Sequence, residues 1–177
     1  MAFGTSSSVF VAWIQAVMGQ GQTAASLPAA SGNTSGLYQG LASDTVKAAL
    51  YGNTITPDKT AARALTGYNA ASSQWVASGN ELTDTNWPAG GEALASKTLN
   101  VSSNVFTFSA GNTSGGGTVT ISNAWGCLVY DDSITASTGG IADQGVCFNS
   151  FGAAQSVTSG TFTIVWNASG IFTVTVS

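Results

Sequence analysis

The second half of the chain alternates between hydrophobic and polar positions with a period of two residues. In the stretch 161–166, Phe162, Ile164 and Trp166 fall on one face of an extended segment. The stretch 171–176 repeats the pattern, and the four residues between the two stretches include a glycine. Such alternation is typical of half-buried strands, and a short glycine-containing connection favours an antiparallel hairpin. We therefore expect the two stretches to pair as a hairpin.

Further strands are predicted where short hydrophobic runs are bounded by turn residues. These runs cover 45–51, 94–101, 105–109, 118–122, 125–130 and 146–151, with a glycine-rich turn at 112–117. About seven short strands at this spacing indicate a mainly β domain over residues 44–177, either an antiparallel β-sandwich or a barrel-like fold. Within this domain, we expect 125–130 and 146–151 to lie as neighbours.

One short helix is predicted inside the β domain. Thr56 suits a helix cap and Pro57 suits the first helical position. Residues 60–65 would complete about two turns, and Gly67 would end the helix.

The stretch 68–91 follows as a long and irregular segment. Loops of this length are often functional or packed against a neighbour. Trp75 and Trp87 lie in it, and exposed tryptophans are favoured at the centre of protein interfaces. We therefore expect these two side chains to contact a partner protein or a neighbouring subunit.

The N-terminus is predicted to form an apolar helical arm, residues 1–19, followed by a Gly-, Ser- and Ala-rich flexible linker, residues 20–43. The apolar run is too short to span a bilayer and lacks the basic start of a signal peptide, so no membrane contact is expected. A lone helix after a linker has nothing of its own to pack against. Four apolar side chains share one face of this helix and are candidate interface residues: Phe10, Trp13, Ile14 and Val17.

Charge is scarce along the whole chain. Only twelve of the 177 side chains are charged, four Lys or Arg and eight Asp or Glu, and there is no histidine. An average soluble domain is about 25% charged. Histidine-based triads and histidine metal sites are excluded, and no motif supplies another base, so we expect no enzyme, no catalytic residues and no cofactor. Four cations cannot form a basic stripe, which argues against nucleic-acid binding.

Two groups of side chains allow more than one interpretation. Asp131, Asp132 and Asp143 bracket one polar loop and offer oxygen ligands for Ca²⁺, but their spacing is not that of an EF-hand. We favour a solvated turn whose carboxylates accept hydrogen bonds from their own backbone, and therefore no metal. Cys127 and Cys147 would lie on two neighbouring strands. A disulfide between them is conceivable, and two buried thiols are the favoured alternative.

Several short segments, in order, resemble small virion structural proteins of tailed actinobacterial bacteriophages, including capsid decoration (minor capsid) proteins. They are DTVKAAL at 44–50, TPD at 56–58, GNEL at 79–82, PAGGEAL at 88–94, VYDD at 129–132, GTFTIVW at 160–166 and GIF at 170–172. The resemblance covers about 44–177 and leaves the N-terminal arm unmatched. It implies assembly in the bacterial host cytoplasm and residence on the virion, with no catalytic residues.

Two functional hypotheses follow from these observations. The leading one is a capsid decoration protein on the outer surface of a phage head, bound to the major capsid protein and forming a homo-oligomer, with a trimer favoured. The low charge suits such dense packing, because it causes little repulsion between copies. The alternative is a tail-tip or fibre module that binds a host-surface glycan through tryptophans in and around 68–91. A third interpretation, a secreted β domain, would predict an oxidised cysteine pair.

Overall fold

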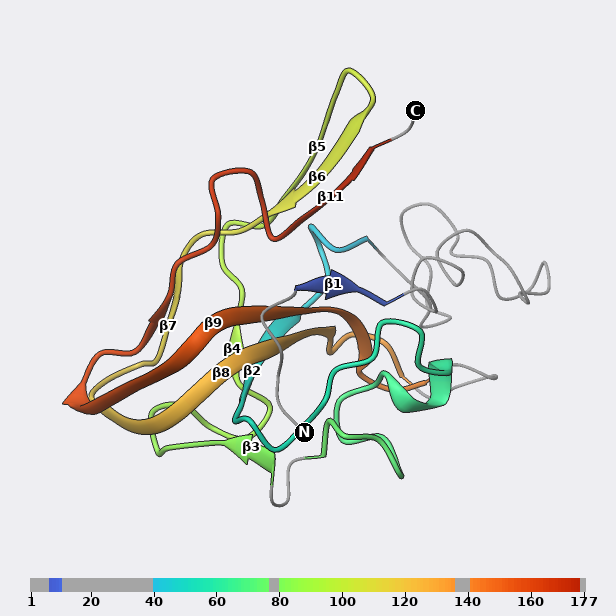
Figure 1. Cartoon of the computed structure of the whole chain (residues 1–177). Coiled ribbons are helices and arrows are strands. Elements are labelled where there is room, and N and C mark those ends of the chain that lie inside the picture. Colours follow the sequence, from blue (N-terminus) through green and yellow to red (C-terminus); the bar gives the residue numbers. More distant parts are fainter. Residues whose placement is uncertain (1–6, 11–39, 77–79, 136–140, 176–177) are drawn as a thin grey trace.

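The computed structural model describes residues 7–10, 40–76, 80–135 and 141–175. These residues form three antiparallel sheets in a mainly β, sandwich-like domain, which confirms the predicted fold class (Figure 1). No closed barrel is present among the described residues.

The largest sheet has six strands in the order β1-β9-β8-β2-β3, and β4 also pairs with β2. Its members are β1 (Ser8–Val9), β2 (Val46–Tyr51), β3 (Glu81–Leu82), β4 (Glu92–Ala93), β8 (Val119–Asp131) and β9 (Gln144–Gly160). Two smaller sheets complete the domain. One joins β7 (Thr113–Ser114) to β10 (Thr163–Ile164), and the other has the order β11-β6-β5, with β5 at Thr98–Ser102, β6 at Val105–Ser109 and β11 at Phe172–Thr175.

The centre of the large sheet is buried on both faces. Five of the six side chains of β2 are buried, and so is the end of β8 that pairs with it, from Val46 opposite Asp131 to Tyr51 opposite Gly126. Trp75 covers one face, since its ring packs edge-on against Tyr51 at a centroid distance of 5.1 Å. Near-continuous burial of this kind explains why β2 is rich in Ala, Val and Leu.

A second layer packs on the sheet from the C-terminal side. The side-chain amide of Asn149 on β9 donates to the carbonyl of Ile171, at 3.2 Å. Phe108 and Phe172 are buried in this layer, with ring centroids 5.6 Å apart. The two layers and the core between them account for the sandwich-like arrangement.

The prediction of an N-terminal helix is wrong for its first residues, which form a strand. Ser8 and Val9 form β1 and pair with Phe148 and Cys147 of β9. The backbone N–H of Phe10 continues this pairing by donating to the carbonyl of Val146, at 3.1 Å. The chain is extended here because it satisfies the edge of β9, which a helix would leave unpaired.

The end of the predicted linker also belongs to the domain. Gly40 adopts a positive φ of 105°, and its carbonyl accepts hydrogen bonds from the N–H groups of Ser43 and Asp44. Leu41 is buried in the core. Residues 11–39, which include the rest of the predicted arm and linker, lie outside the described residues.

The predicted two-turn helix is reduced to one 3-10 turn, Arg63–Leu65. The residues at which the helix was expected to begin make other hydrogen bonds. The backbone N–H and the hydroxyl of Thr60 both donate to Asp58 Oδ1, at 2.7 and 2.6 Å. The side chain of Gln74 brackets Thr56 by accepting from its N–H and donating to its carbonyl. These side-chain hydrogen bonds replace the helical ones.

The predicted C-terminal hairpin is also wrong, although its turn forms. The N–H of Gly170 donates to the carbonyl of Asn167, at 2.8 Å. The two flanking segments then diverge, and β10 pairs with β7 while β11 pairs with β6. Elsewhere the predicted strands at 45–51 and 105–109 are confirmed by β2 and β6. Strands β8 and β9 confirm the predicted neighbours 125–130 and 146–151.

Candidate functional site

Three of the six predicted interface residues lie in the core. Phe10 and Trp87 are 0% exposed and Trp75 is 2% exposed, so the expectation that they present a surface to a partner is wrong. The rings of Phe10 and Trp75 pack edge-on at 5.9 Å, and Trp87 packs edge-on against Phe162 at 5.6 Å. Trp75 and Trp87 are buried because their loops fold back onto the sheet, and Phe10 is buried because it continues the pairing of β1 with β9. The other three lie outside the described residues: Trp13, Ile14 and Val17.

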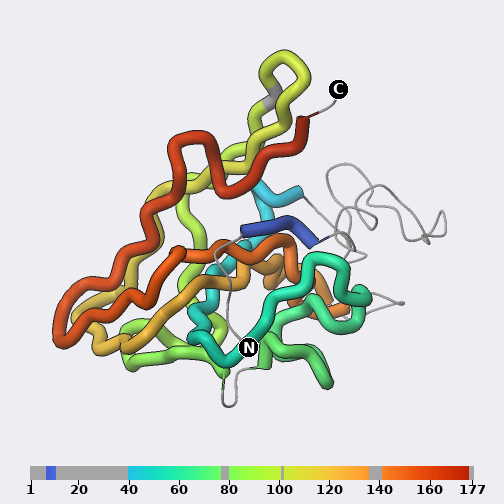
Figure 2. The backbone as a smooth tube through the Cα atoms, in the orientation of Figure 1, coloured from blue at the N-terminus to red at the C-terminus, as the bar shows by residue number. Residues whose placement is uncertain are grey.

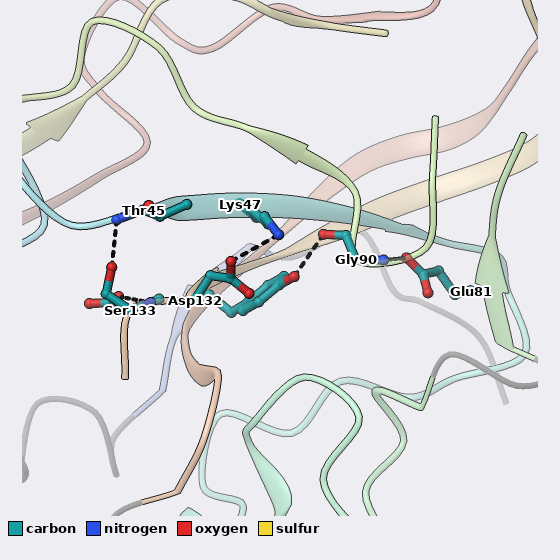
Figure 3. A network of polar contacts seen from close by, with 8 residues as sticks. Thr45, Lys47, Glu81, Gly90, Asp132 and Ser133 are labelled. Atoms are coloured by element: carbon teal, nitrogen blue, oxygen red, sulfur yellow. Dashed lines mark hydrogen bonds and ion pairs between the residues drawn. The ribbon is translucent and has the colours of Figure 1, made fainter. Parts of the chain in front are cut away.

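The loop that carries Trp87 is held by a network of polar contacts (Figure 3). One oxygen of Glu81 accepts from the N–H of Gly90 at 2.8 Å, and the other accepts from the hydroxyl of Tyr68 at 2.8 Å. The hydroxyl of Tyr130 donates to the carbonyl of Gly90, also at 2.8 Å. Burial raises the pKa of Glu81, and the two hydrogen bonds partly offset that effect. The network fixes this loop on the sheet, which is a structural role.

The aspartates near residue 131 take up different environments. Asp131 is fully buried, so it does not belong to a solvated turn, although its Oδ1 does accept from the N–H of Ser133 at 3.0 Å. Burial, followed by the neighbouring carboxyl of Asp44, raises the pKa of Asp131 to about 8. Lys47 forms an ion pair with Asp132 at 2.9 Å, and Ser133 Oγ accepts from the N–H of Thr45 at 2.8 Å (Figure 3).

The ion pair of Lys47 with Asp132 and the hydrogen bond of Thr45 with Ser133 tie β2 to the end of β8. The described residues contain no group of three or more His, Cys, Asp or Glu side chains arranged to hold a metal ion.

The two cysteines are free thiols. Cys127 lies opposite Asn149 and Cys147 lies opposite Val129, so the pair is displaced by two positions along the strands. Both side chains are buried, and burial raises the pKa of Cys127 to about 12. Two buried thiols are therefore what the structure contains.

A groove of about 730 Å³ lies between β9 and the segment 161–171. Figure 2 shows this segment turning back from the end of β9 and running beside it. None of the sixteen residues that line the groove is charged. Three aromatic side chains line it, together with aliphatic, hydroxyl and amide side chains. Sequence reasoning missed this site, although one signal was visible, since no charged side chain follows Asp143.

The three-stranded sheet presents a second candidate surface. It projects beyond the rest of the domain, next to the C-terminus (Figure 1). Residues directly opposite each other in antiparallel strands share a face. Phe108 lies opposite both Leu99 and Phe172, and Phe106 lies opposite Val174, so one face carries all five of these apolar side chains.

The core covers this apolar face completely at its inner end and only in part at its outer end, where Leu99 and Phe106 still pack against the core. Phe108 and Phe172 are buried, Leu99 and Phe106 are half-buried, and Val174 is 37% exposed. The opposite face carries mostly hydroxyl side chains, such as Thr107 and Thr173. The domain's own core therefore leaves the outer end of this apolar face only partly covered.

Comparison with known protein families, with curated proteins and with solved structures gave no match for this chain. In the part of the chain that the structure describes, no helix has the length and apolar character needed to cross a membrane.

Proposed function

We propose that this protein is a non-enzymatic structural component of a tailed-phage virion, a decoration protein on the outer surface of the head. In this role it binds the major capsid protein and forms a homo-oligomer, with a trimer favoured. The observation that carries the proposal is the apolar face of β5, β6 and β11, which the domain's own core covers only in part. Partly uncovered apolar side chains on a projecting sheet are a candidate protein contact, since a partner would complete their burial.

The magnitudes are compatible with such a contact. Burying a large apolar side chain contributes about 1.5–3 kcal/mol. Phe106 and Val174 together would supply a few kcal/mol, and a stable interface needs about 1,000 Å² or more of buried surface. The rest of the interface would come from neighbouring polar surface and from the apolar residues Trp13, Ile14 and Val17. The low charge of the chain limits repulsion between copies packed densely on a shell.

Two of the segments in which we see the resemblance to phage virion proteins lie at positions on which the fold depends. The PAGGEAL segment at 88–94 contains Gly91, at a site where an added Cβ would lie 1.9 Å from the carbonyl oxygen of Ala48. The VYDD segment at 129–132 supplies Tyr130 and Asp131 to the contacts between β8 and its neighbours. These two segments therefore coincide with residues that determine the fold.

The test is binding of the purified protein to empty heads of the phage that encodes it. The double variant Phe106→Ser, Val174→Ser should reduce binding at least about tenfold, because each removed apolar contact is worth about 1 kcal/mol or more. The matched control, Thr107→Ser with Thr173→Ser, changes the opposite face of the same strands and should bind normally. Equal binding by both double variants would contradict the role of the apolar face.

The N-terminal residues need a separate test, because Phe10 belongs to the core. The triple variant Trp13→Ser, Ile14→Ser, Val17→Ser leaves β1 and Phe10 intact, whereas a deletion of 1–19 would not. Weaker binding to empty heads is the expected result. Imaging of labelled virions provides the decisive check of location, since label on the tail would overturn the proposal of head decoration.

A further inference from the structure

The groove between β9 and the segment 161–171 has walls that the fold itself holds in place. At its inner end, the amide of Asn149 donates to the carbonyl of Ile171. On the other wall, the hydroxyls of Ser114 and Thr163 are 2.9 Å apart, which links β10 to β7. The indole N–H of Trp166 donates to Thr113 Oγ1 at 3.1 Å and sets the orientation of that ring. The groove is therefore preformed, as ligand sites usually are.

The chemistry of the lining selects a class of ligand. No charged side chain is available for a phosphate, a carboxylate or an amine. The polar groups are hydroxyls and amides, such as Ser156, Thr161, Gln155 and Asn167, which both donate and accept hydrogen bonds. All four are exposed. A ligand with many neutral hydroxyl groups matches them.

Aromatic rings supply the complementary apolar contacts. Trp166 and Phe151 are half-buried, so each keeps part of its ring accessible from the groove. The rings of Phe151 and Phe162 lie 6.3 Å apart. Flat aromatic faces pack against the C–H faces of sugar rings while the sugar hydroxyls reach the polar side chains.

An extended peptide is the main competing occupant, because β9 borders the groove as an edge strand beyond its pairing with β1. Strand addition needs the edge N–H groups of the host strand. The N–H of Ser150 already donates to Ser7 Oγ at 2.9 Å, and the N–H of Gly152 donates to Ser150 Oγ at 3.1 Å. Hydroxyl side chains thus occupy two of the donors at the start of the free edge of β9, and this disfavours strand addition there.

We propose that this groove binds an uncharged oligosaccharide. Its ligand lies along β9, with sugar rings on Trp166 and Phe151 and hydroxyls on Gln155, Thr161 and Asn167. This site is distinct from the loop tryptophans, since Trp75 and Trp87 are buried. The inference does not depend on the virion role, because the apolar face of β5, β6 and β11 lies outside the groove.

The experiment is a glycan array probed with the full chain, followed by titration of the best neutral tetrasaccharide. The array should contain neutral glucose, mannose, galactose and N-acetylglucosamine oligomers together with sialylated and sulfated glycans. Binding to a neutral glycan but not to its charged counterparts is expected. Absence of binding to every neutral glycan at about 1 mM would overturn the proposal, and so would preferential binding to charged glycans.

Variants then locate the site on the protein. Gln155→Ala changes an exposed side chain and should weaken binding about three- to tenfold, the effect of one lost hydrogen bond. Trp166→Ala should weaken it about tenfold or more, and Trp166→Phe should retain part of the affinity because a ring remains. Thermal unfolding of each variant separates loss of binding from loss of folding.

The control variant Val174→Ser lies outside the groove and should bind the glycan normally. Unchanged glycan binding by both Gln155→Ala and Trp166→Phe would overturn the placement of the site. Loss of binding to empty heads in Val174→Ser, with glycan binding intact, would show that the two surfaces act independently.

Discussion

Strands β2 and β6 are similar in length and hydrophobicity, and each pairs with neighbours on both edges, yet they differ in how they are buried. Strand β2 is buried along nearly its whole length, and the loop that carries Trp75 packs against Tyr51 on one of its faces. Strand β6 has one polar face and one apolar face, and the apolar face is only partly covered around Phe106. The comparison shows that hydrogen-bond pairing completes a sheet, whereas burial depends on which distant segments pack on it.

We call the six-stranded sheet that contains β2 the covered sheet, and the sheet of β5, β6 and β11 the projecting sheet. A substitution in the covered sheet should destabilise the protein most where a loop lies closest to β2. An added Cβ at Gly91 would lie 1.9 Å from the carbonyl oxygen of Ala48, and Gly91 has a φ of +72°. We expect Gly91→Ala to lower the free energy of unfolding by at least about 4 kcal/mol, because the loop must move off the strand. Urea unfolding followed by tryptophan fluorescence measures the change.

Gly152 provides the control for backbone strain. It also has a positive φ, +77°, but no heavy atom lies within 4 Å of an added Cβ. Gly152→Ala should therefore cost only about 1 kcal/mol, the penalty for placing a side chain in this backbone region. If the two variants lost equal stability, strain alone would explain the effect at Gly91 and the close approach to β2 would not matter.

The second prediction compares one phenylalanine from each region. Phe10 packs inside the covered sheet, with its ring centroid 5.4 Å from that of Phe148. Phe10→Ala should cost about 3–5 kcal/mol, which is typical of a buried phenylalanine. Phe106→Ala, in the projecting sheet, should cost less than half as much because that ring is only half-buried. Equal losses in thermal or urea unfolding would mean that the projecting sheet is as tightly packed as the covered one.

The third prediction concerns the pH dependence of the covered sheet. Burial and the Asp44 carboxyl raise the pKa of Asp131 to about 8 in the folded protein, whereas an unfolded chain has a value of about 3.9. The folded state thus holds this proton more tightly. Its contribution to stability is fully present below about pH 4 and is lost as the pH rises through about 8.

Asp131→Asn should flatten this decline, because an amide does not ionise. The free energy of unfolding, measured from about pH 5 to about pH 9, should fall less in the variant than in the original protein. Asp58→Asn serves as the control. The pKa of the exposed Asp58 is lowered by hydrogen bonds from Thr60, so its contribution is lost only as the pH falls. If the free energy of unfolding fell with pH as much in Asp131→Asn as in the original protein, the Asp131 carboxyl would not be the source of the decline.

The smallest effect is expected at the ion pair between Lys47 and Asp132. Both side chains are about one-third exposed, so water and salt screen their attraction. Lys47→Ala should lower the free energy of unfolding by less than about 1 kcal/mol, and the difference should shrink in high salt. A larger loss would show that this pair, and not only packing, holds β2 against the end of β8.

Parts of the two proposed binding surfaces could be predicted from the sequence and parts could not. The alternating pattern over 171–176 places Phe172 and Val174 on one face of a strand, but it does not show that the core covers this face only in part. The absence of charge after Asp143 is visible in the sequence, yet the groove exists only because the segment 161–171 folds back beside β9. Trp75 and Trp87 of the long loop were expected at an interface but are buried, because an irregular segment of sequence does not indicate how deeply its side chains are buried.

The sequence by itself determined the β class of this protein, the positions of strands such as β2 and β6, and the scarcity of charge that limits its chemistry. Local periodicity is sufficient for this, because side chains alternate between the two faces of any strand. Tertiary structure decided which strands pair and which side chains are covered. Strands β10 and β11 pair with β7 and β6 and not with each other, and Phe10, near the N-terminus, is part of the core. These outcomes depend on contacts between residues far apart in the chain, which no local pattern encodes.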